Sequence, residues 1–274
     1  GAGNDVIYGG AGNDTISVGT GFDTVYGDAG ADTFNVTSSS NVSLSGGADA
    51  DTFNMANVLS AGDTVSGGDG TDTLNISGTF TAGAFTNVRG VENIVATAAS
   101  TIALNSADQA GISGATFDLT SATNQSVTLD STITGGSVKF LLGSGVDTDS
   151  VNASASAASI TVSGNANYFD AVDSLIGGNG SSDTLSITAD GATADLTNVS
   201  KFESIVVGAN GVSDIGIDLG SYTTALTVDA RALTSSSADM TLLAGSASGN
   251  LTIYGGSGAD VVTAGTGVDY MSGG

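Results

Sequence analysis

The sequence contains no cysteine and no histidine. Without cysteine the chain has neither a disulfide framework nor thiolate ligands for a metal ion. Without histidine it has no Ser-His-Asp or Cys-His catalytic arrangement, no imidazole zinc site and no HExxH metalloprotease motif. These classes of enzyme and metal site are therefore excluded.

Proline is also absent, and the basic residues Lys139, Lys201, Arg89 and Arg231 stand against 28 acidic ones, for a net charge of −24. With no basic patch to neutralise phosphates, no nucleic-acid binding is expected. Such acidity is typical of disordered chains. Here, however, 40% of the residues are hydrophobic and the aspartates are periodic. We therefore expect a folded chain that binds cations.

Long apolar runs and helical patterns are lacking as well. No stretch of about 18 apolar residues occurs, so no membrane span is expected. Helix formers are scarce, and only Ser106–Ala110 suggests a single helical turn, capped by Ser106. Short alternations such as Ile160-Thr-Val162 and Leu251-Thr-Ile253 recur instead. They predict an all-β chain of short strands and turns.

A nine-residue repeat fills the first 35 residues. GGAGNDTIS at Gly9–Ser17, VGTGFDTVY at Val18–Tyr26 and GDAGADTFN at Gly27–Asn35 follow a copy, GAGNDVIY, that lacks its first position. Each copy has a glycine-rich turn, an aspartate at position six and a large apolar residue at position eight. The aspartates are Asp5, Asp14, Asp23 and Asp32, and the apolar residues are Ile7, Ile16, Val25 and Phe34.

The nine-residue frame continues with less regularity after Asn35. It retains an aspartate at Asp51, Asp63 and Asp72, and it places Asn41 in the aspartate position of Val36–Leu44. It returns as GGSGADVVT and AGTGVDYMS, which contain Asp260 and Asp269. Leu251 occupies the preceding aspartate position, so Asp260 is predicted to lack a carboxylate partner below it.

The pattern resembles the calcium-binding nonapeptide of the repeats-in-toxin (RTX) family, G-G-x-G-x-D-x-U-x, where U is large and apolar. The resemblance implies a right-handed parallel β-roll, or β-helix solenoid, with calcium ions between stacked turns. Two nonapeptides then form one coil, and equivalent turns stack about 4.8 Å apart. One face would carry Asp14, Asp32, Asp51 and Asp72, and the other Asp5, Asp23, Asn41 and Asp63.

Oxygen-only ligation by about six ligands suits Ca²⁺, whereas Mg²⁺ demands tighter octahedral geometry. The glycines allow positive φ and let backbone carbonyls approach the gap between turns, and the aspartates add carboxylate oxygens. The candidate calcium-binding residues are Asp5, Gly10, Gly12, Asp14, Gly19, Gly21, Asp23, Gly27, Gly30, Asp32, Gly46, Asp49, Asp51, Asp63, Gly67, Gly70, Asp72, Asp173, Asp183, Gly255, Gly258, Asp260, Gly265, Gly267 and Asp269.

An aspartate in a glycine-rich turn often only caps its own backbone. For Asp63, Asp147, Asp173 and Asp183 the sequence leaves calcium ligation and turn capping both open. An EF-hand is excluded, because neither Asp49-Ala-Asp51 nor Asp147-Thr-Asp149 is followed by the glycine and glutamate of that loop. The capping role is assigned to Asp28, Asp69, Asp108, Asp190 and Asp239.

Simple energetics connect calcium to folding. Carboxylates about 5 Å apart repel by roughly 0.8 kcal/mol in water, and by more in less polar surroundings. The repeat offers only one large apolar side chain per nine residues, and its burial contributes about 2 kcal/mol. We therefore expect metal binding and folding to be coupled.

A longer repeat is superimposed on the short one. Ala61–Ala96 aligns with Ala171–Gly208, and further on Phe117-Asp-Leu119 resembles Ile217-Asp-Leu219. A unit of roughly 110 residues therefore occurs twice, which suggests stacked coils of one solenoid. The predicted regions are RTX repeats at residues 1–76, an irregular β-solenoid with the second copy at residues 77–252, and a truncated repeat block at residues 253–274.

Enzyme activity is not expected. Glu92 and Glu203, the only glutamates, could form a glycosidase pair, but they are equivalent residues of the two copies, which favours a shared structural task such as bonding turn amides. Arg89 and Arg231 would suit a calcium-assisted lyase, yet they are not equivalent and no aromatic cleft for sugar rings is recognisable.

The remaining sequence, rich in Thr, Ser and Ala, is similar to calcium-binding bacterial surface-layer (S-layer) proteins of the Caulobacter type. This resemblance implies type I secretion, folding outside the cell and self-association into a two-dimensional lattice at the cell surface. The alternative is a calcium-binding stalk or C-terminal module of a type I-secreted adhesin, toxin or hydrolase. Because Gly1 and Gly274 both fall inside a repeat, we expect a longer parent chain, with any envelope anchor outside this segment.

Overall fold

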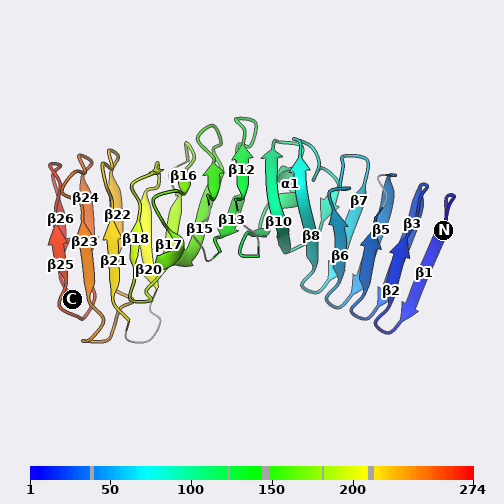
Figure 1. Cartoon of the computed structure of the whole chain (residues 1–274), viewed down its shortest axis with the longest axis horizontal. Helices are drawn as coiled ribbons and strands as arrows, with labels where there is room; N and C mark the ends of the chain where they lie inside the picture. Colours follow the sequence, from blue (N-terminus) through cyan, green and yellow to red (C-terminus); the bar gives the residue numbers. More distant parts are fainter. Residues whose placement is uncertain (38–39, 122–123, 144–147, 181, 209–212) are drawn as a thin grey trace. The chain divides into compact units, whose positions relative to one another are not determined.

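The computed structural model describes residues 1–37, 40–121, 124–143, 148–180, 182–208 and 213–274, so Asp147 lies outside the described residues. Within these residues the chain is a parallel β-solenoid, in which each short strand pairs with the equivalent strand of the next coil (Figure 1). This confirms the predicted all-β solenoid. The chain divides into two compact units, Gly1–Val138 and Lys139–Gly274. This division follows packing, and the three repeat-based regions stay a prediction.

Unit 1 is built from two rows of strands with one short helix. One row is β1-β3-β5-β7-β9 and the other contains β2-β4-β6-β8-β10 (Figure 1). The elements are β1 (Val6–Ala11), β2 (Thr15–Val18), β3 (Asp23–Ala29), β4 (Thr33–Val36), β5 (Val42–Ala48), β6 (Thr52–Ala56), β7 (Thr64–Asp69), β8 (Thr73–Phe80), β9 (Val88–Arg89), β10 (Asn93–Leu104), α1 (Gln109–Ile112), β11 (Thr116–Asp118) and β12 (Ser126–Leu129), with β13 (Ser137–Leu141) at the unit boundary.

Strand register confirms that two nonapeptides form one coil. Thr15 of β2 pairs with Thr33 of β4, and Thr33 pairs with Thr52 of β6. The first of these steps is 18 residues, as the backbone-to-carboxylate bond from Asp14 to Asp32 also shows. Later coils lengthen, to 21 residues between Asp51 and Asp72. The nine-residue rule therefore applies most strictly at the start of the chain.

The core of unit 1 is a stack of apolar side chains from alternate strand positions. Position eight is buried as predicted from Ile16 onward, and the rings of Phe34 and Phe53 stack with centroids 4.7 Å apart. In the row of β2, β4, β6 and β8, the first residue after the nonapeptide is large and buried too, as Val36 and Met55 show. In the other row this position is a glycine, such as Gly27. Every second repeat thus buries two large side chains, and the expectation of one overlooked the next inward-facing position of those strands.

Unit 2 continues the same construction. Its rows include β18-β21-β23-β25 and β17-β20-β22-β24-β26. The elements are β14 (Ser150–Asn152), β15 (Ser159–Asn165), the 3₁₀ turn η1 (Ala166–Tyr168), β16 (Ser174–Ile176), β17 (Thr184–Thr188), β18 (Thr193–Asp195), β19 (Val199–Ser200), β20 (Ser204–Gly208), β21 (Ile215–Asp218), β22 (Leu226–Asp229), β23 (Met240–Leu243), β24 (Leu251–Tyr254), β25 (Val261–Thr263) and β26 (Tyr270–Ser272).

The duplicated segment has the same bonds in both units. The side-chain amide of Asn87 donates to the carbonyl of Ala61 at 3.0 Å, and that of Asn198 donates to the carbonyl of Ala171 at 2.6 Å. The alignment beyond Glu92 and Glu203 needs correction. Thr116 N bonds to the Glu92 carbonyl and Thr227 N to the Glu203 carbonyl, so Phe117 corresponds to Val228.

Ile217 instead belongs to the other row, where it pairs with Ala194. The similarity of Phe117-Asp-Leu119 to Ile217-Asp-Leu219 reflects the common strand pattern rather than equivalent places.

The predicted helical turn exists but begins later than Ser106. It is α1, whose N-cap is Asp108. The Asp108 carboxylate, fully buried, accepts hydrogen bonds from the backbone N–H groups of Gly83 and Phe85 at 2.8 Å. These bonds to another coil fix where the helix starts. In the described part of the chain, no helix has the length and apolar character needed to span a membrane.

Candidate metal centre

Four aspartates of unit 1 stack in one column, as the repeat predicts. In this Asp14 column, the backbone N–H of Asp14 donates to Asp32 Oδ1, that of Asp32 to Asp51 Oδ1, and that of Asp51 to Asp72 Oδ1. Each of these bonds is 2.7 Å long. One carboxylate oxygen of each later coil is therefore satisfied by the coil before it.

The second oxygen of each carboxylate has no such partner. Oδ2 of Asp14, Asp32, Asp51 and Asp72 is inaccessible to solvent and accepts no hydrogen bond, and the same holds for Asp23. A buried, unpaired carboxylate oxygen is unfavourable unless a cation or donor compensates it. These oxygens are the strongest indication of a bound cation in the described structure.

Backbone oxygens converge on the same places. A Cβ atom built on Gly27 would lie 2.2 Å from Asp32 Oδ2 and 2.6 Å from the carbonyl oxygen of Gly46 in the next coil. A Cβ on Gly46 would lie 2.1 Å from Asp51 Oδ2 and 2.5 Å from the Gly67 carbonyl oxygen. Only glycine leaves this space open, and the space is lined by oxygen acceptors.

The turn of the preceding coil contributes a further carbonyl oxygen. A Cβ on Gly30 would lie 2.4 Å from the carbonyl oxygen of Gly12. Positions two and four of each turn have positive φ: Gly10 and Gly12, Asp28 and Gly30, Gly47 and Asp49, and Gly68 and Gly70. Asp28 and Asp49, each with φ of 76°, thus occupy glycine positions with exposed side chains.

Electrostatics in the Asp14 column favour cation binding. Burial, together with the neighbouring carboxylates of Asp72 and Asp32, raises the pKa of Asp51 to about 6. Burial likewise raises the pKa of Asp72, with a contribution from Glu92. Both shifts express the cost of holding anions in a stack without counter-charge. The carbonyl and carboxylate oxygens around them are ligands that Ca²⁺ prefers.

The second column is shorter than predicted. Asp5 N donates to Asp23 Oδ1 at 2.9 Å, but Asp23 pairs with Val42 rather than Asn41. Val42 N in turn donates to Asp63 Oδ1. The expectation that Asn41 fills the aspartate position was wrong, because this coil contains one extra residue. Val42 therefore separates the two halves of the column.

Amide donors occupy both oxygens of the irregular aspartates. Asp63 accepts from Val42 N and Ser60 N, at 2.9 and 2.7 Å. Asp183 accepts from Ile160 N and Gly178 N, at 2.8 and 2.5 Å. Asp173 likewise accepts from Asp149 N and Asp170 N. The geometry favours turn capping over calcium ligation for these three.

Glu92 and Glu203 each end a stack of carboxylates. Glu92 Oε2 accepts from Asp72 N at 2.9 Å, and Glu203 Oε2 accepts from Asp183 N at 2.8 Å. Each glutamate therefore occupies the position that an aspartate has elsewhere. This confirms the expectation that the two glutamates share one structural task and bond turn amides.

In the C-terminal repeats, each aspartate accepts a hydrogen bond from a residue of the preceding coil that has no carboxylate. Met240 N donates to Asp260 Oδ1 and Leu251 N to Asp269 Oδ1, each at 3.0 Å. Asp260 lacks a carboxylate below it, as predicted, but the residue there is Met240, because Leu251 belongs to the Asp269 stack. A Cβ built on any of four glycines here would meet an oxygen of Asp260 or of the preceding coils. These glycines are Gly255, Gly258, Gly265 and Gly267.

Side chains at position five form a ladder that the sequence did not indicate. Asn4 and Asn13 accept from the backbone N–H of Phe22 and Ala31 in the next coil. Asn250 accepts from Val268 N in the same way, and Asp239 from Ala259 N. Asp239 thus bonds a neighbouring coil rather than its own turn. Such bonds depend on coil stacking, so residue type alone could not reveal them.

Only some of the predicted capping aspartates cap locally. Asp190 accepts from Ala192 N at 3.0 Å, as expected. Asp108 contributes mainly to another coil, and Asp28 and Asp69 are exposed at the turns. No group of three or more carboxylates gathers among the described residues. A calcium ion would therefore depend on backbone carbonyls as much as on side chains.

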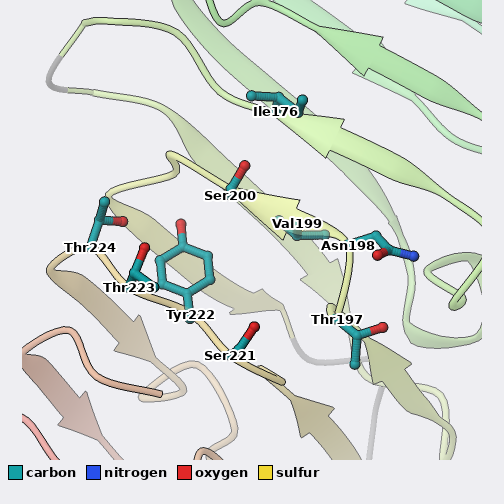
Figure 2. Close-up of a pocket in the computed structure, with 9 residues that line it drawn as sticks. All are labelled: Ile176, Thr197, Asn198, Val199, Ser200, Ser221, Tyr222, Thr223 and Thr224. Carbon is teal, nitrogen blue, oxygen red and sulfur yellow. The ribbon is translucent and has the colours of Figure 1, made fainter. Parts of the chain in front are cut away.

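A small hollow in unit 2 lies beside Tyr222. Thr197, Ser200 and Ser221 lie around Tyr222, as Figure 2 shows. The Tyr222 hydroxyl is buried and donates to the Phe202 carbonyl at 2.6 Å while accepting from Phe202 N at 2.7 Å. Burial raises its pKa to about 12. This tyrosine links coils and has no acid or base partner for catalysis in the hollow.

Comparison with known proteins agrees with the geometry of the turns. The RTX calcium-binding nonapeptide repeat matches in four copies, over residues 1–25, 9–36, 59–75 and 248–274. No curated protein and no solved structure matches the chain. The matched stretches contain Asp14, Asp32 and Asp72 with their open oxygens. The chain therefore carries RTX calcium-binding nonapeptide repeats, a motif typical of secreted calcium-binding proteins.

Proposed function

We propose that the chain is a structural calcium-binding segment of a bacterial S-layer protein, which folds with calcium outside the cell. The observation that supports calcium is the set of buried Oδ2 atoms in the Asp14 column that face glycine carbonyls. Asp14, Asp32, Asp51 and Asp72 would supply carboxylate oxygen, and the glycines at turn positions one and four would supply carbonyls. Calcium bound there would neutralise the column and link successive coils.

Coupling to export is the second part of the proposal. An acidic chain with stacked carboxylates is destabilised without calcium and stabilised with it. The calcium-binding repeats of such a chain would stay unfolded during type I secretion and fold where calcium is abundant. Self-association into a lattice rests on the similarity of composition to S-layer proteins. No enzyme activity is proposed.

Calcium titration tests the shared part of this proposal. Circular dichroism should show loss of β-structure in EGTA and its return with Ca²⁺, and calorimetry should show several ions binding. Replacing all four aspartates of the Asp14 column by asparagine should abolish most of that binding. The matched control also replaces four aspartates by asparagine, but ones that bond amides of their own turns: Asp118, Asp130, Asp195 and Asp218. Full β-structure in EGTA would contradict coupled folding.

Electron microscopy distinguishes the S-layer role from the alternative, a stalk or C-terminal RTX module of a secreted adhesin, toxin or hydrolase. With added Ca²⁺, the S-layer proposal expects ordered two-dimensional sheets of the full-length parent protein. Persistent monomers in calcium would favour the stalk.

A further inference from the structure

Lys201 adopts a backbone conformation that lysine rarely has, with φ of 62°. Its counterpart in the other copy of the duplicated segment is Gly90, with φ of 56°. The strand pairs make them equivalent, since β9 pairs with β7 as β19 pairs with β16. A side chain in this region is strained unless its contacts hold it there. The contacts of Lys201 are made by its ammonium group.

The ammonium of Lys201 links three successive turns. Its Nζ donates to the carbonyl oxygen of Ser154 at 3.2 Å and to Asn179 Oδ1 at 3.0 Å. Ser154 follows β14, Asn179 follows β16 and Lys201 follows β19, and these strands pair in that order. A single positive charge with three donors therefore bridges oxygens of adjacent coils.

The equivalent turns of unit 1 offer oxygens but no such donor. There Asp72 Oδ2 is buried without a partner, and a Cβ on Gly67 would lie 1.8 Å from the Gly90 carbonyl oxygen. In unit 2, a Cβ on Gly177 would lie 2.2 Å from the Lys201 carbonyl oxygen, so the backbones match. Asp183 Oδ2, however, accepts from Gly178 N.

We propose that Lys201 is a built-in cation, which does for the turns of unit 2 what a calcium ion does for the equivalent turns of unit 1. The second copy of the duplicated segment then keeps its turns stacked without calcium. This inference rests on the proposed calcium function of unit 1. The test uses calcium-free protein, so that the role of Lys201 can fail independently of the calcium function of unit 1.

Hydrogen exchange of the full chain in EGTA tests the role of the ammonium. Lys201→Met keeps the length and apolar stem of the side chain and removes its charge, and Lys139→Met in β13 is the control because Lys139 is exposed. Amides of residues 150–158 and 174–180 should exchange about tenfold faster in Lys201→Met than in the control. Equal exchange in the two variants would overturn the proposal, whatever calcium does to unit 1.

The converse substitution transfers the cation to unit 1. A Cβ on Gly90 would meet nothing closer than Gly68 N at 3.4 Å, so there is room for a side chain, and the strain from the φ of 56° is common to both variants. In EGTA, Gly90→Lys should slow exchange at residues 67–72 severalfold relative to Gly90→Met, which adds similar bulk without charge. Identical exchange in these two variants would show that the ammonium does not replace calcium there, and would overturn the proposal.

Discussion

The Asp14 column of unit 1 and the strand ends of unit 2 use the same residue in different ways. In the column, the carboxylates of Asp32, Asp51 and Asp72 each bond the preceding coil through one oxygen and leave the other buried and unpaired. At the strand ends, Asp195 and Asp218 bond amides two residues later in their own turns. Acidic composition is therefore no measure of calcium binding. The position of an aspartate relative to the stacked turns decides its role.

The two units also hold their coils together by different means. Unit 1 contains stacked carboxylates whose second oxygens are buried and unpaired. In unit 2, neutral groups and a lysine also link the coils. The Tyr222 hydroxyl bonds to the Phe202 carbonyl, and the Lys201 ammonium bonds to the Ser154 carbonyl. We expect unit 1 to respond strongly to calcium, and unit 2 to respond weakly outside its RTX repeats at residues 248–274.

The largest effect is expected for Gly27→Ala. The new methyl would lie 2.2 Å from Asp32 Oδ2 and 2.6 Å from the Gly46 carbonyl, so it would both clash and fill the cation space. The free energy of unfolding should fall by about 3 kcal/mol or more, measured by urea denaturation in calcium. Gly135→Ala is the control, because its nearest neighbour would be 3.8 Å away. Similar stability of the two variants would contradict the assigned geometry.

Alkaline pH should destabilise unit 2 through Tyr222. Its folded pKa of about 12 exceeds the ordinary value of 10, so the neutral hydroxyl is favoured in the folded state. The stabilisation is complete below pH 10 and is lost as pH rises through 12, by roughly 2 kcal/mol. Thermal unfolding followed between pH 8 and 12 measures this loss. Tyr222→Phe should remove this part of the pH dependence, and an unchanged profile would disprove the assignment to Tyr222.

A single charge removal tests the roles of the two kinds of aspartate. Asp32→Asn keeps an oxygen for Asp14 N but removes the charge, so calcium affinity should fall about tenfold, or about 1.4 kcal/mol. Asp195→Asn should leave calcium affinity unchanged, because Asp195 serves only its own turn. Isothermal titration calorimetry of both variants measures the difference. Equal losses would mean that net charge, and not the column, controls binding.

The smallest effect is expected at the exposed ion pair of unit 2. Arg231 contacts Asp229 and lies over the Tyr254 ring at 4.5 Å, and its side chain is largely exposed. Arg231→Gln should leave the unfolding temperature nearly unchanged, measured by thermal unfolding with and without calcium. A large, calcium-dependent loss would assign this pair to the calcium response, against the contrast drawn between the units.

The all-β solenoid and the Asp14 column could be predicted from the sequence. A nine-residue period places equivalent residues one coil apart, so Asp14, Asp32 and Phe34 could be assigned to turn or core without coordinates. The shared role of Glu92 and Glu203 followed from their equivalence in two copies. Local pattern is sufficient wherever the period is strict, because each residue then repeats its surroundings.

The places where coil length changes could be located only in the folded structure. One extra residue put Val42 instead of Asn41 beside Asp23, and a longer coil put Met240 below Asp260. Likewise, Asp63 and Asp183 proved to have both oxygens occupied by amides, and Lys201 proved to reach two other turns. Strand register and contacts between coils are non-local, so a single residue of insertion changes them while the local sequence pattern stays the same.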